Sequence, residues 1–138
     1  LPAGWLSRPA APANYRGEIP GDWPEEQKRE LLAGYKVAVC RENSYEPYYF
    51  TEKFVEAVCA GCVPVIERID LAEGILRGAV WVDPSNFGHD RTATLEAALA
   101  QNAKAIREHN EQWLRSPAVA ETHLSAIFAR IGRLLARD

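Results

Sequence analysis

Short valine-rich segments alternate with helical patterns along residues 35–82, and this alternation constrains the fold more than any other feature of the sequence. Residues 35–40 and 62–66 are apolar and too short for buried helices, which favours strands. Between them, residues 51–61 begin with a threonine and reach a glycine, as helices often do. The apolar residues of this helix share one face: Phe54, Val55, Val58 and Cys59. The pattern predicts parallel strands joined by a crossover helix.

The alternation continues with a weak helical pattern at residues 69–76 and a third strand at residues 79–82. We therefore expect an α/β fold with a Rossmann-like parallel sheet and helices on its faces. A chain of 138 residues has the length of one domain. Its hydrophobic share of 47% and its charged share of 25% are those of a folded globular protein.

Three parts are expected along the chain. Residues 1–24 hold five of the nine prolines, which predicts a loop or linker that enters the domain. Residues 25–115 form the α/β core, beginning with a short helix that ends at Gly34. Residues 116–138 form a C-terminal helix after a break at Pro117.

Two apolar helical faces are expected near the end of the chain. A long helix before the proline break would carry the first face: Leu95, Leu99, Ile106 and Trp113. The last helix would carry the second face: Leu124, Ile127, Phe128, Ile131 and Leu135. The spacing is that of amphipathic helices that pack on a core.

Charge and composition exclude several classes of partner. The net charge of -3, with acidic and basic residues interleaved, leaves no basic surface for nucleic acid. No apolar run is long enough to span a membrane, and the first residues lack a signal-peptide pattern. The three cysteines lie in apolar segments, as thiols do in a reducing compartment, so a cytoplasmic location is expected. The chain has no methionine, and we expect it to be a piece of a longer protein.

Cys59 and Cys62 are spaced as a CxxC pair, but they lie at the end of the predicted helix rather than at its start. A thiol there is not activated by the helix dipole, so packing roles are expected for both residues. No second cysteine pair and no Asp-x-Asp motif accompany them. Neither a metal nor a cofactor is expected.

Residues 41–53 are where chemistry is expected first, because ligands of parallel sheets bind beyond the carboxyl ends of the strands. Glu42 and Glu52 offer carboxylates that accept hydrogen bonds from sugar hydroxyls. Lys53 lies in the first turn of a helix, where a cation costs roughly 0.3 to 1 kcal/mol unless an anion is bound. Removing Lys53 is therefore expected to leave the unliganded fold intact. The pattern favours a nucleotide-sugar pocket, with a solvated loop capped at Thr51 as the open alternative.

Residues 35–66 read YKVAVCRENSYEPYYFTEKFVEAVCAGCVPVI. This stretch resembles the C-terminal signature of the family 10 glycosyltransferases, the α1,3/4-fucosyltransferases. In that family Tyr-Lys-Phe, Glu-Asn-Ser, Tyr-x-Thr-Glu-Lys and Ala-Gly-x-Val-Pro-Val follow one another. The segments YRGEIPG and VWVDPSNF are also similar to family segments, so the resemblance covers roughly residues 14–100.

The resemblance implies the GDP-fucose-binding C-terminal half of an inverting glycosyltransferase of the GT-B type. It implies that Glu52 contacts the ribose and Lys53 the diphosphate, and that an upstream arginine, for which Arg16 is the candidate, also holds the diphosphate. The residues implied to line the donor site are Glu42, Asn43, Tyr49, Glu52 and Lys53. The catalytic base and the site of the glycan acceptor would belong to an N-terminal domain that this chain lacks, and the whole enzyme could lie peripherally at a membrane.

The sequence departs from the family pattern after the second strand. Residues 66–69 replace an aromatic residue and a glycine of the family, and Asn86 replaces an aspartate. These changes bear on the identity of the sugar. Two alternatives are therefore open: a GT-B transferase that uses another nucleotide sugar, and a non-catalytic binding or protein-interaction module of the same fold.

Overall fold

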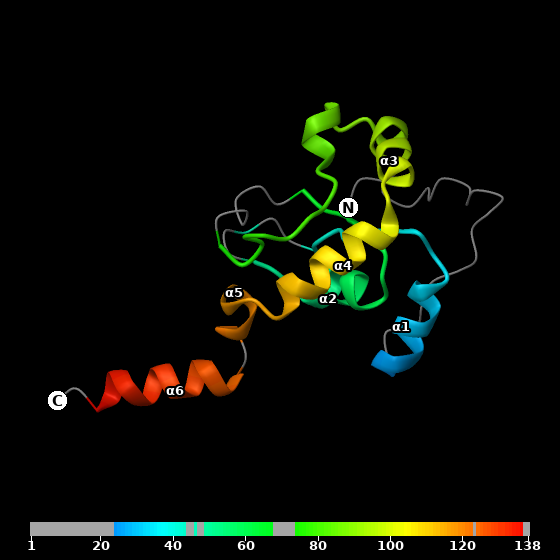
Figure 1. Cartoon of the computed structure of the whole chain (residues 1–138). Coiled ribbons are helices and arrows are strands. Elements are labelled where there is room, and N and C mark those ends of the chain that lie inside the picture. Colours follow the sequence, from blue (N-terminus) through cyan, green and yellow to red (C-terminus); the bar gives the residue numbers. More distant parts are fainter. Residues whose placement is uncertain (1–23, 44–45, 47–48, 68–73, 123, 137–138) are drawn as a thin grey trace, which may run out of the picture.

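Two short parallel strands form the centre of the fold in the computed structural model, which describes residues 24–43, 46, 49–67, 74–122 and 124–136. Strand β1 (Val37–Val39) pairs with strand β2 (Val63–Val65) in parallel, and the chain crosses from one to the other through helix α2 (Glu52–Cys59). Figure 1 shows α2 near the middle of the molecule. The predicted parallel strands and their crossover helix are therefore confirmed.

The third predicted strand is reduced to a single bridge. Val82 forms a single parallel bridge with Val65 of β2. Three segments therefore lie side by side in the order β1, β2 and Val82. Residues 79–81 form no ladder, because both the N–H and the C=O of Val80 bond to the side chain of Asn110 instead of to a strand. The fold is thus mixed α/β with a small two-stranded parallel sheet and several helices.

Helices cover both faces of the sheet because side chains alternate along β2. Val63 and Val65 pack with Ala98 of α3 (Arg91–Ala100) and Ile106 of α4 (Ala103–Leu114). The other face belongs to a second cluster around Phe54 of α2. That cluster includes Cys40, Cys62, Ile66, Leu76 and Trp113. The core therefore lies on both sides of the strands, as expected for a parallel sheet.

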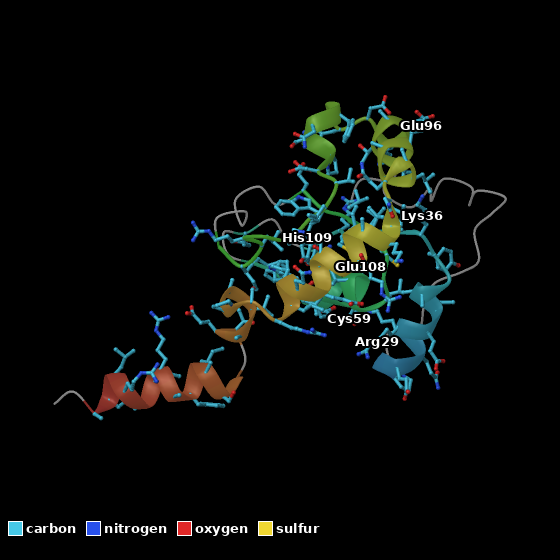
Figure 2. The ribbon with its side chains drawn as sticks, viewed as in Figure 1. Arg29, Lys36, Cys59, Glu96, Glu108 and His109 are labelled. Carbon is cyan, nitrogen blue, oxygen red and sulfur yellow. The ribbon has the colours of Figure 1, made fainter. Side chains whose placement is uncertain are left out.

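Helix α2 is buried along one side, but Cys59 does not share that environment. Phe54, Ala57 and Val58 are buried, whereas Cys59 is exposed at the last turn, where Figure 2 labels it. The expected packing role is therefore wrong for Cys59. It is right for Cys62, which is buried and whose thiol lies 3.2 Å from the carbonyl oxygen of Leu32, in helix α1 (Glu25–Ala33), and 3.3 Å from that of Tyr35.

The long helix expected before Pro117 is two helices. The chain is extended at Gln101, and the Asn102 side chain accepts a hydrogen bond from the Ala105 N–H, which starts α4 afresh. Because the break changes the direction of the chain, the expected common face is lost. Leu95 and Leu99 are exposed, and Ile106 and Trp113 are buried.

The remaining elements are short or peripheral. Helix α1 (Glu25–Ala33) contacts α2 and ends at Gly34, as predicted. The other elements are a 3-10 helix η3 (Pro84–Phe87), a short helix α5 (Pro117–Ala120) and the last helix α6 (Leu124–Leu135). Residues 74–78 form turns instead of the end of the predicted helix at 69–76, and residues 69–73 lie outside the described residues. The boundaries at residues 24 and 115 stay predictions.

Helix α6 does not pack on the core as its apolar pattern predicts. Figure 1 shows it extending away from the other elements. Its large side chains are exposed: Ile127, Phe128, Ile131, Leu134 and Leu135. Among the described residues, no helix has both the length and the apolar character needed to cross a membrane.

Candidate functional site

A pocket of about 200 Å³ lies at the carboxyl ends of the strand segments. Each segment contributes residues to it: Arg41 and Glu42 follow β1, Glu67 follows β2, and His89 comes after the Val82 bridge. The first residue of α3, Arg91, completes the charged lining. This is the edge of the sheet at which ligands of parallel α/β folds bind.

Glu42 connects the end of β1 to the start of α2. Its side chain is only 1% exposed. One carboxylate oxygen accepts the backbone N–H of Thr51 at 3.0 Å, and the other accepts the Thr51 hydroxyl at 2.6 Å. Both hydrogen-bond donors of the residue that precedes α2 are thereby held by one buried carboxylate.

Lys53 brings a positive charge to this carboxylate. Its ammonium nitrogen lies 3.6 Å from Glu42 Oε2 and donates a hydrogen bond of 3.1 Å to Thr51 Oγ1. It also lies 3.8 Å from the exposed carboxylate of Glu52. The ion pair with Glu42 gives Lys53 a structural role that the sequence pattern did not reveal. The expectation that its removal leaves the unliganded fold intact therefore needs correction.

Within the part of the chain that the structure describes, the first N–H groups of α2 have no acceptor. Thr51 is the residue before the helix, as predicted, but its side chain makes no capping bond to the helix; its hydroxyl donates to Glu42 and accepts from Lys53 instead. The first N–H groups of a helix have no partner within the helix. Lys53 and these N–H groups are thus neighbours at one end of α2, an arrangement that suits an anion.

The candidate residues from the sequence are only partly brought together. Glu42, Glu52 and Lys53 form one cluster. Asn43 is exposed and follows Glu42, and Tyr49 lies two residues before Thr51. Arg16 lies outside the described residues. The candidate site therefore consists of the cluster of Glu42, Glu52 and Lys53.

Four polar residues of the pocket were missed from the sequence: Arg41, Glu67, His89 and Arg91. Glu67 is paired with His89, whose Nδ1 lies 3.4 Å from its Oε2. His89 has a φ of 62°, in the left-handed region, and follows Gly88 with a φ of 60°. The signal that could have found Arg41 and Glu67 is their position directly beyond the ends of predicted strands.

Cys40 lies in the floor of the pocket and is not a nucleophile. Its thiol is buried, and burial raises the pKa of the Cys40 thiol to about 12, with the neighbouring Cys62 as a smaller cause. The thiol donates weakly to the Lys53 carbonyl oxygen at 3.5 Å. Cys40 therefore stays protonated at neutral pH and helps to join the end of β1 to α2.

No protein-family model, curated protein or solved structure matches this chain. The function proposed below rests on the geometry of the pocket, on the cluster around Glu42 and on the motif resemblance described above.

Proposed function

We propose that this chain is the donor-binding domain of an inverting, fucosyltransferase-like glycosyltransferase of the GT-B type. Its donor would be GDP-fucose or a similar nucleotide sugar, bound by a Rossmann-like half of the enzyme. The observation that carries the proposal is the cluster of Glu42, Glu52 and Lys53 at the N-terminus of α2, beside a pocket at the carboxyl edge of the sheet. The same residues carry the motif resemblance.

The diphosphate of the donor would bind at the start of α2. Lys53 supplies a charge-assisted hydrogen bond, and the free N–H groups of the first turn supply neutral ones. Glu42 would hold the Lys53 side chain in place, because its buried carboxylate lies against the Lys53 ammonium group. Glu52 is 60% exposed and available to the ribose hydroxyls. The two glutamates would therefore have different roles, Glu42 in positioning and Glu52 in binding.

In the whole enzyme, a base from another domain would take the proton of an acceptor hydroxyl. The resulting oxygen nucleophile would attack the anomeric carbon of the donor from the face opposite the diphosphate, and the bond from that carbon to the diphosphate oxygen would break. Lys53 and the helix N-terminus would then stabilise the negative charge on the departing nucleoside diphosphate. No residue of this chain is assigned as the base.

A second candidate function follows from α6. Its apolar side chains are exposed, with Phe128 at 66% and Leu135 at 74%. A face of this kind is typical of a surface that binds another protein. The chain would then be a non-catalytic interaction module that keeps the α/β fold. A GT-B transferase that uses a different nucleotide sugar is the alternative that differs less from the main proposal.

Calorimetric titration of the chain with GDP-fucose, GDP, UDP and NAD separates these candidates. We expect weak binding of GDP and GDP-fucose, because the site would be shared with a second domain, and weaker binding of UDP and NAD. Binding of UDP in preference to GDP would favour another donor. Equal binding or no binding of all four nucleotides at millimolar concentration would contradict the donor-binding function and favour the interaction module.

A further inference from the structure

The pocket combines apolar walls with a charged rim. Val39, Ile66 and Pro84 are among the apolar residues that line it. The charged residues of its lining are two carboxylates and two guanidinium groups: Glu42, Glu67, Arg41 and Arg91. A planar ring with polar edges, such as a nucleobase, fits this combination, because its faces pack on apolar walls while its edges meet charged side chains.

One oxygen of the Glu67 carboxylate has a polar partner. Its Oε2 lies 3.4 Å from His89 Nδ1, and within the described part of the chain His89 is its only polar partner. Gly88 and His89 are both in the left-handed region, which turns the chain after η3 back toward the end of β2. One face of the Glu67 carboxylate is therefore left to accept hydrogen bonds from a ligand.

The pocket is joined directly to the proposed diphosphate site. Glu42 lines the pocket and lies 3.6 Å from the Lys53 ammonium group. A nucleoside diphosphate with its phosphates at the start of α2 therefore has its base within reach of the pocket. This step rests on the proposed function.

We propose that Glu67 is a specificity-determining residue that reads the guanine base of the nucleotide. Guanine presents two adjacent donors, the N1–H and the 2-amino group, which a carboxylate accepts as a pair of parallel hydrogen bonds. Its O6 and N7 are acceptors that suit an arginine guanidinium, and Arg41 and Arg91 lie on the same rim.

The same carboxylate discriminates against other bases. The corresponding edge of adenine presents a bare ring nitrogen, whose lone pair would face the carboxylate oxygens. Uracil presents one N–H between two carbonyl oxygens, so a carboxylate can accept one bond while a carbonyl oxygen faces its other oxygen. A mismatch in which two acceptors face each other costs more than a missing contact.

Inosine diphosphate is the sharpest probe, because its base differs from guanine by the absence of the 2-amino group. We expect the unmodified chain to bind GDP about tenfold or more tightly than IDP, since a hydrogen bond to a carboxylate is lost. In Glu67→Ala this preference should disappear, with GDP and IDP binding equally. Glu67 is 45% exposed, so the substitution should not affect folding, which circular dichroism checks.

Glu108→Gln is the matched control, because Glu108 is an exposed glutamate of α4, labelled in Figure 2, whose side chain pairs with Lys104. This variant should keep the preference for GDP. Equal affinities of the unmodified chain for GDP and IDP, or an unchanged preference in Glu67→Ala, would overturn the role of Glu67 and leave the donor-binding function intact. Absence of binding of either nucleotide would overturn both proposals.

Discussion

At the scale of single residues, Glu42 and Lys53 show why a sequence pattern locates a site better than it assigns roles. The pattern placed both residues in the loop beyond the first strand, and the structure brings them within 3.6 Å of each other. It could not show that both oxygens of Glu42 are bonded to Thr51, because that contact depends on how the loop folds back on α2. The pairing of Glu67 with His89 was missed for the same reason.

Replacing Glu42 tests this structural role. Glu42→Gln keeps the shape of the side chain but removes its charge and one acceptor, so a Thr51 donor and Lys53 lose a partner in a buried place. We expect the free energy of unfolding to fall by about 1 to 3 kcal/mol, measured by urea denaturation. Glu108→Gln, at an exposed position, should change it by less than about 0.5 kcal/mol. Equal stability of the two variants would contradict the role given to Glu42.

At the scale of elements, hydrophobic periodicity predicted the helices and strands whose formation depends on the burial of apolar side chains alone. It identified β1, β2 and α2, of which β2 is buried along its whole length, α2 is buried along one side and β1 is only partly buried. It failed where a polar side chain controls the backbone. Asn102 divides one predicted helix into α3 and α4, and Asn110 occupies the backbone groups of Val80 that a third strand would need. Neither asparagine disturbs the apolar pattern, so neither effect was visible in it.

Asn110 should therefore be essential to the packing of α4 on the sheet. Its side chain is buried and makes two hydrogen bonds of 2.8 Å, accepting from Val80 N–H and donating to Val80 C=O. Asn110→Ala leaves both backbone groups unpaired, and we expect a loss of about 2 to 4 kcal/mol in the free energy of unfolding. Gln112→Ala, on the exposed side of the same helix, is the control and should be nearly neutral. A small effect of Asn110→Ala in urea denaturation would show that water replaces these bonds.

At the scale of the whole molecule, the core is small and lies around two strands of three residues each. The sequence indicated the α/β class but overestimated the sheet and the burial of the last helix. An amphipathic pattern shows that a face is apolar, and it does not show what covers that face. The exposed side of α6 is the result. Two buried thiols, Cys40 and Cys62, remain as titratable groups of the core.

Because of these two buried thiols, we expect the free energy of unfolding to fall at alkaline pH. Burial raises the pKa of Cys40 from 9.0 to about 12 and also raises that of Cys62. At neutral pH the Cys40 thiol is protonated in both the folded and the unfolded chain. Between its unfolded and folded pKa values the unfolded chain loses the proton first, so the free energy of unfolding falls as the pH rises.

Cys40→Ser removes one of these titrations while keeping a small hydrogen-bonding side chain. Between about pH 8 and about pH 10.5 we expect this variant to lose about 1 to 2 kcal/mol less stability than the unmodified chain. Urea denaturation at the two pH values measures the difference. The same alkaline loss in both proteins would mean that Cys40 ionises in the folded state as easily as in the unfolded one.

The central claim is that an anionic nucleotide binds at the start of α2 through Lys53, and the affinity of Lys53→Ala for GDP tests it most directly. Calorimetry should be done well below the melting temperature of the variant, which we expect to be lowered because Glu42 loses its cation. Lys104→Ala, which removes an exposed lysine from α4, is the control. The account predicts that Lys53→Ala weakens GDP binding by about ten- to a hundredfold, and that Lys104→Ala leaves it unchanged. A lower melting temperature of Lys53→Ala with unchanged GDP affinity would contradict the account, because Lys53 would then be structural alone and the nucleotide would bind elsewhere.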